Sequence, residues 1–339
     1  MSFVVSEIQG KAGIIGLDRP AAMNALTLDM IRDIDAALDR FESDPSVQCV
    51  ILRSNHERAF SAGGDMRRIR ELALAGQFDE AEQFFREEYA LIERIAGLAK
   101  PYIALIDGIC MGGGMGLSVH GRYRIATERA VFAMPEAAIG FFPDVGASHF
   151  LPRMPHQSGM WMGLTGATVR GFDAHGLGIS THMTVAESLP KLVNDLCHSD
   201  QAIDDILRSW CASLGYQPSV LMLAGTTLCF DQPTLCSIAD CLKRQQTKPT
   251  QRALSDLAKG SPRSLQETLS LLREGKDRSL SACLAQEFEA MQRAIRHPDF
   301  AEGVRAVLVD KDHAPTWQSR NCRAETGLTP NYKKEKVKK

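Results

Sequence analysis

The chain has 339 residues, of which 44% are hydrophobic and 24% are charged, the balance of an ordinary globular protein with one large domain or a domain plus an appendage. Its net charge of −2 provides no field that would attract a nucleic acid or an anionic membrane, so neither is expected as a partner. No apolar run is long enough to span a bilayer, and the N-terminus resembles neither a signal peptide nor an Arg-rich leader, so we expect a cytoplasmic protein.

The first half of the chain alternates strands and helices. Strands are expected, in chain order, at residues 3–8, 13–17, 47–53, 101–106, 123–126 and 131–134. Helices are expected after Thr27, which is a suitable N-cap, at residues 78–96 and from about Met115. This alternation indicates an α/β fold with a mostly parallel sheet.

The second half of the chain is expected to be largely helical. The predicted helices lie at residues 180–197, 202–214, 264–273 and 280–295. We therefore expect an α/β catalytic core at residues 1–200 and a helical C-terminal region at residues 201–339.

The sequence contains nine cysteines, an odd number, and none has C-x-x-C spacing. Free intracellular thiols account for this pattern better than disulfides or a zinc site. No metal is predicted.

Two glycine-containing segments each follow an expected strand and precede an expected helix. The first, at residues 59–65, has the sequence AFSAGGD, and the second, at residues 107–116, has DGICMGGGMG. Glycine allows a ligand to approach the backbone closely, and the N–H groups at a helix start can face a negative oxygen. Two such N–H groups converging on one oxygen would form an oxyanion hole. Tight strand-to-helix turns remain the alternative explanation for both segments.

The glycine spacing also argues against other enzyme classes. The second segment has neither the G-x-G-x-x-G pattern of a dinucleotide site nor the Gly-Lys-Ser/Thr of a P-loop. Residues 116–120 do not form the G-x-S-x-G of a serine hydrolase.

Three acidic residues are expected in apolar surroundings. Glu136 and Asp144 lie within the mostly apolar stretch at residues 132–146, and Glu88 falls on the apolar face of its helix. Burial tends to raise the pKa of a carboxyl, which is the condition for acid–base chemistry near neutral pH. Helix capping, an arginine partner or a buried salt bridge would equally account for these acids.

Taken together, these segments resemble the crotonase (enoyl-CoA hydratase/isomerase) superfamily. The matching segments are residues 61–65, 112–114, 134–136 and 302–306. Within the superfamily the chain is more similar to the 3-hydroxyisobutyryl-CoA hydrolase branch, on residues 84–89, 111–121, 132–145, 150–153, 261–262 and 300–317. The resemblance spans nearly the whole chain and is weakest across residues 198–248 and at the C-terminal end.

The resemblance implies a crotonase-like spiral of ββα turns that holds an acyl-CoA thioester between the two loops, with no cofactor beyond the coenzyme A of the substrate. The implied site residues are the oxyanion-hole amides of Gly64 and Gly113, the catalytic carboxyls of Glu136 and Asp144, and the substrate-binding residues Glu88, Ala62 and Gly112. Glu136 would attack the thioester to give a mixed anhydride, or would activate water. Asp144 would orient the hydroxyl or water and pass a proton to the leaving thiolate.

Two positions depart from the pattern of many relatives. Hydratases of this superfamily usually carry a second glutamate just after the triple glycine, where this chain has Gly116. Many relatives also have a basic residue after Arg19-Pro20 that can contact the phosphates of coenzyme A, where this chain has Ala21, so another cation must serve.

The predicted function is hydrolysis of a short 3-hydroxyacyl-CoA, either 3-hydroxyisobutyryl-CoA or 3-hydroxypropionyl-CoA, to the hydroxy acid and free coenzyme A, as in valine catabolism. The alternatives are an enoyl-CoA hydratase or isomerase, which the glycine at position 116 argues against, and a non-catalytic acyl-CoA-binding protein of the same fold. The expected partner is the acyl-CoA substrate, and a homo-oligomer is possible.

Overall fold

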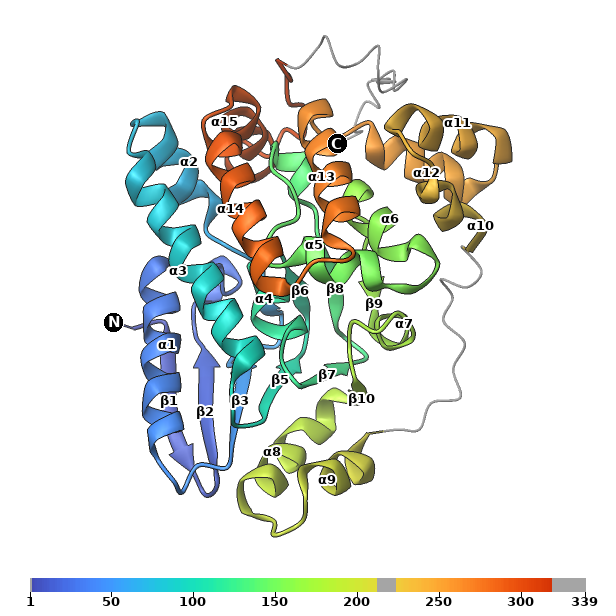
Figure 1. The fold of residues 1–339 in the computed structure, drawn as a ribbon. Helices are drawn as coiled ribbons and strands as arrows, with labels where there is room; N and C mark the ends of the chain where they lie inside the picture. The colour runs from blue at the N-terminus through green and yellow to red at the C-terminus, as the bar shows by residue number, and fades with distance from the viewer. Residues whose placement is uncertain (1, 212–223, 319–339) are drawn as a thin grey trace, which may run out of the picture.

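A computed structural model describes residues 2–211 and 224–318, and two sheets form its centre (Figure 1). The larger sheet has the strand order β1-β2-β3-β5-β7-β10, in which only the β1–β2 pair is antiparallel. Its strands are β1 (Val4–Gln9), β2 (Ala12–Leu17), β3 (Cys49–Ser54), β5 (Tyr102–Ile106), β7 (Tyr123–Thr127) and β10 (His182–Thr184). The smaller sheet has the order β4-β6-β8-β9, formed by β4 (Ala59–Ser61), β6 (Ile109–Met111), β8 (Val131–Ala133) and β9 (Val169–Arg170).

The chain winds as a spiral whose turns have two strands followed by helix, as the family resemblance implies. The first turn gives both β1 and β2 to the larger sheet, and each of the next three turns gives one strand to the larger sheet and the next strand to the smaller one. The pair β3–β4 is followed by α2 (Met66–Leu74) and α3 (Phe78–Gly97), and the pair β5–β6 by α4 (Gly113–Val119). The pair β7–β8 is followed by the short 3₁₀ helix η2 (Glu136–Ile139). This repeat places the loops after β4, β6 and β8 at one edge of the smaller sheet.

Helices cover both faces of the larger sheet. On one side α1 (Leu28–Ser43) packs beside α3, and the Thr27 hydroxyl caps α1 by accepting a hydrogen bond from the Met30 amide at 3.2 Å. On the other side α8 (Leu189–His198) and α9 (Ile203–Trp210) bury the apolar side chains that the strands direct away from α1 and α3. That second core contains Ile14, Ile51, Ile103, Ile125, Leu192, Leu196 and Leu207.

The remaining helices belong mainly to the C-terminal part of the chain. Between β8 and α8 lie α5 (Ala147–Phe150), α6 (Ser158–Thr165) and α7 (Gly171–Gly176). The later helices are α10 (Ala224–Thr227), α11 (Leu235–Gln245), α12 (Lys248–Leu257), α13 (Pro262–Gly275), α14 (Leu280–Ile295) and α15 (Pro298–Val304), which continues into the π-helical turn η8 (Arg305–Val309). Figure 1 shows α13, α14 and α15 lying against the core, where α14 packs on α3 and α5. The helical C-terminal part thus packs directly against the helices of the core.

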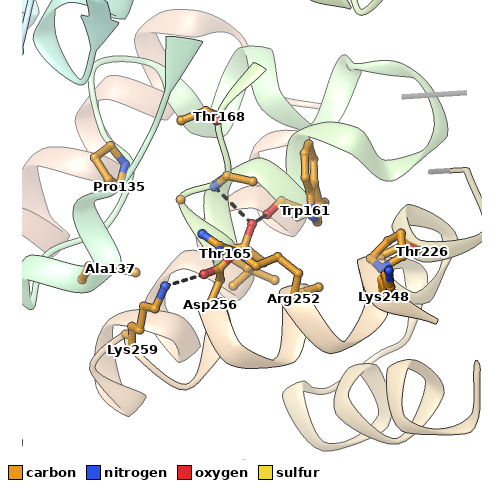
Figure 2. Close-up of a pocket in the computed structure, with 17 residues that line it drawn as sticks. Pro135, Ala137, Trp161, Thr165, Thr168, Thr226, Lys248, Arg252, Asp256 and Lys259 are labelled. Atoms are coloured by element: carbon orange, nitrogen blue, oxygen red, sulfur yellow. Dashed lines mark hydrogen bonds and ion pairs between the residues drawn. The ribbon is translucent and has the colours of Figure 1, made fainter. Parts of the chain in front are cut away.

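A hollow of about 640 Å³ lies between this helical part and the core, lined by residues of η2, α6 and α12 (Figure 2). Of its basic residues Lys248, Arg252 and Lys259, the last two pair with Asp256. None of the site residues expected from the sequence lines this hollow.

The structure corrects one predicted helix. Residues 180–197 were expected to be helical throughout, but β10 occupies His182–Thr184 and α8 begins only at Leu189. A strand of three residues shows no recognisable periodicity, and β10 forms because β7 offers it a parallel partner.

The expectation that all cysteines are free is wrong for one pair. Cys229 and Cys241 form a disulfide, with Cα atoms 5.5 Å apart. The chain turns after Cys229 so that α11 packs back against the 3₁₀ turn at Leu228–Asp231, which contains Cys229. A separation of twelve residues is not a recognised disulfide motif, so the sequence does not reveal this pairing. Five other cysteines in the described ranges are free, namely Cys49, Cys110, Cys197, Cys211 and Cys283. No helix within those ranges is long and apolar enough to cross a membrane.

Candidate active site

The two glycine loops lie side by side because β4 and β6 are parallel neighbours in the smaller sheet. Gly63 has φ +98° and Gly112 has φ +47°, backbone conformations that favour glycine. A Cβ atom at Gly63 would lie 3.3 Å from the Gly113 amide nitrogen, and one at Gly113 would lie 3.3 Å from the Gly64 amide nitrogen. No atom of the described chain accepts a hydrogen bond from the Gly64 or the Gly113 amide. Two free N–H groups therefore lie together at the edge of one cavity.

Three carboxyl groups from different elements line this cavity, which has a volume of about 140 Å³ and is called the acyl cavity below. Glu88 comes from α3, Glu136 begins η2, and Asp144 lies in the loop before α5. All three residues are buried, with 2%, 7% and 5% of their surface exposed. Glu136 Oε1 lies 2.8 Å from the position that a Cβ atom would take at Gly112, and a Cβ atom at Gly113 would collide with Glu88 Oε1. The glycines thus leave room for the acids as well as exposing amides.

The three carboxyls have few polar partners within the described chain. Asp144 Oδ2 accepts a hydrogen bond from the Tyr89 hydroxyl at 2.7 Å, whereas Glu88 Oε1 and Glu136 Oε2 accept none. The salt bridge considered for Glu88 does not form, since no basic side chain lines the acyl cavity.

Burial controls the protonation of this cluster. It raises the pKa of Glu88 and of Glu136 well above the usual range, and the neighbouring Asp144 carboxylate raises both further. Burial also raises the pKa of Asp144 to about 7, although the Tyr89 hydroxyl opposes the shift. The Asp144 carboxyl can therefore take up and release a proton near neutral pH.

The remaining walls of the acyl cavity are apolar. They consist mainly of Met66, Phe84, Phe85, Ile139, Phe141, Val307 and Leu308. Val307 and Leu308 come from the turn η8, so the C-terminal part of the chain closes the cavity.

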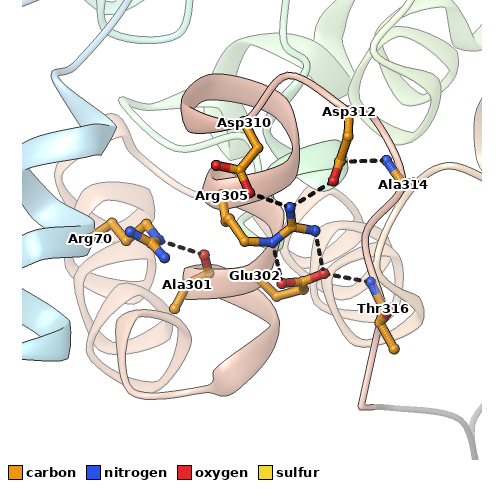
Figure 3. Close-up of polar contacts among 8 residues, drawn as sticks. All are labelled: Arg70, Ala301, Glu302, Arg305, Asp310, Asp312, Ala314 and Thr316. Carbon is orange, nitrogen blue, oxygen red and sulfur yellow. Dashed lines mark hydrogen bonds and ion pairs between the residues drawn. The ribbon is translucent and has the colours of Figure 1, made fainter.

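Arg305 holds η8 in place, as Figure 3 shows. Its guanidinium donates hydrogen bonds to the carboxylates of Glu302, Asp310 and Asp312 at 2.6–2.9 Å. The Arg67 side chain on α2 donates to the Leu308 carbonyl, which ties the same turn to the core.

A groove of about 850 Å³ adjoins the acyl cavity, and we call it the entry groove. The two share Ala62, Gly64, Met66, Phe84 and Leu308. Ala21 lines the entry groove, so the basic residue expected at this position from many relatives would also face the groove.

The basic side chains of the entry groove differ in their availability. Arg19 pairs with Asp65 at 2.8 Å, and Arg32 pairs with Glu87 at 2.7 Å. Arg67 and Arg68, which also line the groove, have partners in the Leu308 carbonyl and Glu71. Lys311 is exposed, and no hydrogen bond or ion pair involves its ammonium group within the described ranges. Lys311 is therefore the groove cation most available to an anionic ligand.

Neighbouring side chains occupy the space beside Gly116, the position at which hydratases are expected to carry their second glutamate. A Cβ atom at Gly116 would lie 2.7 Å from Val145 Cβ and 2.8 Å from Ile92 Cδ1. No acidic side chain fits there while Val145 keeps its place, so the acids of the acyl cavity come only from α3, η2 and the loop before α5.

Several contributors to the site are not evident from the sequence. Tyr89 stands beside Glu88 in the motif at residues 84–89, so it had a signal that was not used. Val145, Leu308 and Lys311 had none, because their positions depend on how distant segments pack. No cluster of three or more His, Cys, Asp or Glu side chains suited to a metal ion occurs in residues 2–211 and 224–318.

The chain belongs to the enoyl-CoA hydratase/isomerase family, whose pattern matches residues 12–326. Among characterised relatives it is 41% identical to the mitochondrial 3-hydroxyisobutyryl-CoA hydrolases of Rattus norvegicus and of Homo sapiens. Each match extends over 332 residues, which is 95% of this chain and 86% of the relative.

Solved structures show the same fold. An enoyl-CoA hydratase from Rhodobacter sphaeroides 2.4.1 superposes with a TM-score of 0.88 at 35% identity, covering 97% of this chain and 98% of the other. A carnitinyl-CoA dehydratase from Mycobacterium thermoresistibile gives a TM-score of 0.88 at 32% identity, covering 97% of both chains. The predicted α/β crotonase fold with a helical C-terminal part is thereby confirmed.

Proposed function

We propose that this chain hydrolyses a short 3-hydroxyacyl-CoA, either 3-hydroxyisobutyryl-CoA or 3-hydroxypropionyl-CoA, to the 3-hydroxy acid and free coenzyme A. The observation that carries the proposal is the acyl cavity itself, in which buried carboxyls face two free amides. The identity with 3-hydroxyisobutyryl-CoA hydrolases over 95% of the chain supports the substrate class. A volume of about 140 Å³ suits a short acyl group rather than a fatty chain.

In this mechanism the thioester carbonyl oxygen lies between the Gly64 and Gly113 amides, which stabilise its negative charge in the transition state. The Glu136 carboxylate either attacks the carbonyl carbon or removes a proton from an attacking water. In both routes the carbon–sulfur bond breaks, and protonated Asp144 gives its proton to the departing thiolate. In the water route Glu136 then passes the proton that it took from water to Asp144, which restores both groups. In the covalent route water then cleaves the mixed anhydride and restores the Glu136 carboxylate.

The other site residues bind the substrate. Glu88, Ala62 and Gly112 all line the acyl cavity. Glu88 would exchange a hydrogen bond with the 3-hydroxyl group, and Ala62 and Gly112 would lie beside the thioester. Lys311 would bind a phosphate of coenzyme A in the entry groove, in place of the cation missing at Ala21.

The principal alternative is hydration of an enoyl-CoA, the activity named for one structural relative. Adding water across a double bond calls for acid–base groups at both carbons, and Val145 fills the space over Gly116 where the second acid would stand. Cytoplasmic location and homo-oligomerisation stay predictions, and the names of the hydrolase relatives place those proteins in mitochondria.

The proposal is tested by thiol release from a panel of acyl-CoA thioesters, with Glu136→Gln beside the wild type. The variant should lose at least about 10²–10⁴-fold in kcat, the usual worth of a positioned acid–base group. A variant within about threefold of the wild type would remove Glu136 from the mechanism.

A further inference from the structure

The Asp144 carboxyl is carried by a turn with an unusual backbone. Val145 has φ +56° and Gly146 has φ +80°, so two consecutive residues are left-handed. A β-branched residue rarely adopts this conformation, and it persists only where surrounding contacts enforce it. The turn puts the Val145 side chain over Gly116 and leaves the Asp144 carboxyl lining the acyl cavity.

One buried carboxyl from a distant helix holds this turn. Glu287, on α14, has none of its surface exposed. Its Oε2 accepts a hydrogen bond from the Gly146 amide at 2.7 Å, and its Oε1 accepts from the Ser148 amide at 2.9 Å and from the Ser148 hydroxyl. All three partners are donors, so the side chain engages both ends of the short segment that follows Asp144.

A second side chain, from α4, also holds the turn. His120, at the end of α4, is 2.9 Å from the Val145 carbonyl oxygen through Nε2. Because a carbonyl only accepts, Nε2 carries the proton. Burial lowers the pKa of His120 to about 4, so the imidazole is neutral at physiological pH. A Cβ atom at Gly146 would lie 2.6 Å from His120 Nε2, which leaves no room for another residue type at that position.

We propose that Glu287 is a positioning residue for Asp144: with His120 it enforces the left-handed turn that keeps the Asp144 carboxyl in the acyl cavity and Val145 over Gly116. The mechanistic consequence rests on the role proposed above for Asp144. Glu287 does not line the acyl cavity, so it does not touch the substrate, and its hydrogen bonds reach Asp144 through the backbone of the turn. The C-terminal helical part thereby contributes to catalysis as well as to the cavity wall.

The test is a double-mutant cycle in the full-length protein between Glu287→Gln and Asp144→Asn. The Gln variant keeps one acceptor oxygen but turns an amide N–H₂ toward one of the donors. Displacing a reacting group by about 1 Å can cost on the order of 10²-fold, so Glu287→Gln should lower kcat by about 10- to 100-fold. The Michaelis constant should stay within about threefold, since Glu287 is remote from the entry groove.

The decisive outcome concerns additivity. Because Glu287 acts through Asp144, Glu287→Gln should cause little further loss of kcat when Asp144 is already Asn. Wild-type kcat in folded Glu287→Gln, or the same fold-loss in both backgrounds, would overturn the proposal.

Asp299→Asn provides the matched control. Asp299 is also buried in the C-terminal part, where it accepts hydrogen bonds from the Ser261 hydroxyl and the Gln318 amide, but it does not bond the turn after Asp144. It should lower the melting temperature without lowering kcat below about a third of the wild-type value. An equal kcat loss in Asp299→Asn and Glu287→Gln would reduce Glu287 to a stability residue and overturn the proposal.

If Glu287→Gln does not fold, His120→Gln takes its place in the same cycle, because it weakens the same turn from α4. Both cycles use whichever acyl-CoA thioester the wild type turns over fastest. Failure to release thiol from a 3-hydroxyacyl-CoA would therefore count against the proposed function alone, and additivity in the cycle against the positioning role alone.

Discussion

Replacing Asp144 with Asn should make the protein less stable than the wild type in acid and more stable in mild alkali. The rise in the pKa of Asp144 from 3.8 to about 7 corresponds to about 4 kcal/mol, at about 1.36 kcal/mol per pKa unit. A carboxyl whose folded pKa is raised stabilises the fold fully below its unfolded pKa and loses that contribution as the pH rises through its folded pKa. The wild type should therefore lose up to about 4 kcal/mol between about pH 4 and pH 8, and the variant should be spared that loss.

The substitution also has a cost at every pH. The Asn carbonyl can still accept the Tyr89 hydroxyl, but the amide brings N–H groups into a buried site, at about 1–3 kcal/mol. At pH 4 only this cost remains, so the variant should be less stable by about 1–3 kcal/mol. At pH 8 the variant avoids the loss of up to about 4 kcal/mol that ionisation of Asp144 causes in the wild type, and this gain exceeds the cost of the buried amide. The variant should then be more stable by about 1–3 kcal/mol.

The assay is urea unfolding followed by circular dichroism at intervals from pH 4 to pH 8, with thiol release measured on the same samples. Asp240→Asn is the control, because the Asp240 side chain is 62% exposed and should give no such crossover. The kcat of Asp144→Asn should fall by about 10²–10⁴-fold. A variant that is less stable than the wild type at every pH would refute the view of Asp144 as a desolvated acid.

Other substitutions test the parts of the site separately. Gly113→Pro removes an amide donor at the first residue of α4, where proline is tolerated by a helix. Its Cβ atom also collides with Glu88 Oε1, so Gly113→Ala, which adds the same Cβ and keeps the amide, is the control. The Pro variant should have a kcat about 10²–10³-fold below that of the Ala variant, and equal kcat values in the two folded variants would withdraw this amide from the oxyanion hole. Lys311→Ala should raise the KM for acyl-CoA about tenfold with kcat unchanged, and an unchanged KM would leave the phosphate contact elsewhere. Leu308→Ala should widen the acyl cavity, so that kcat/KM for pentanoyl-CoA and hexanoyl-CoA rises relative to kcat/KM for 3-hydroxyisobutyryl-CoA. If this ratio does not change, η8 does not set the length of the acyl group.

Local patterns in the sequence were sufficient for most of the fold. The strands at β2 and β3 and the helix α3 were found within about two residues, because each has a strong apolar pattern of its own. Thr27 was expected as an N-cap and is one, since capping depends only on neighbouring residues. The strand β10 was missed because it depends on a partner strand, and the disulfide because it depends on the folding back of α11.

In the candidate site, too, the features set by local sequence patterns could be predicted, and those set by contacts between distant segments could not. Glu88, Glu136 and the two glycine loops come from motifs that are continuous in the sequence, and the structure brings them together around the acyl cavity. Glu287 lies 141 residues from Gly146, and no spacing rule links the two. The contact of Val145 with Gly116 could not be predicted from the sequence either, because the Val145 side chain reaches Gly116 only through a left-handed turn that residues of α4 and α14 hold in place.

The most direct test of the account compares two reactions of the wild-type protein. In one, 3-hydroxyisobutyryl-CoA and 3-hydroxypropionyl-CoA are supplied and free thiol is trapped with a thiol reagent. In the other, crotonyl-CoA is supplied and the loss of its enoyl absorbance is followed. The account predicts rapid thiol release from at least one hydroxyacyl-CoA and slow or no hydration of crotonyl-CoA. Rapid hydration with no thiol released from either hydroxyacyl-CoA would contradict it and leave only the family assignment standing.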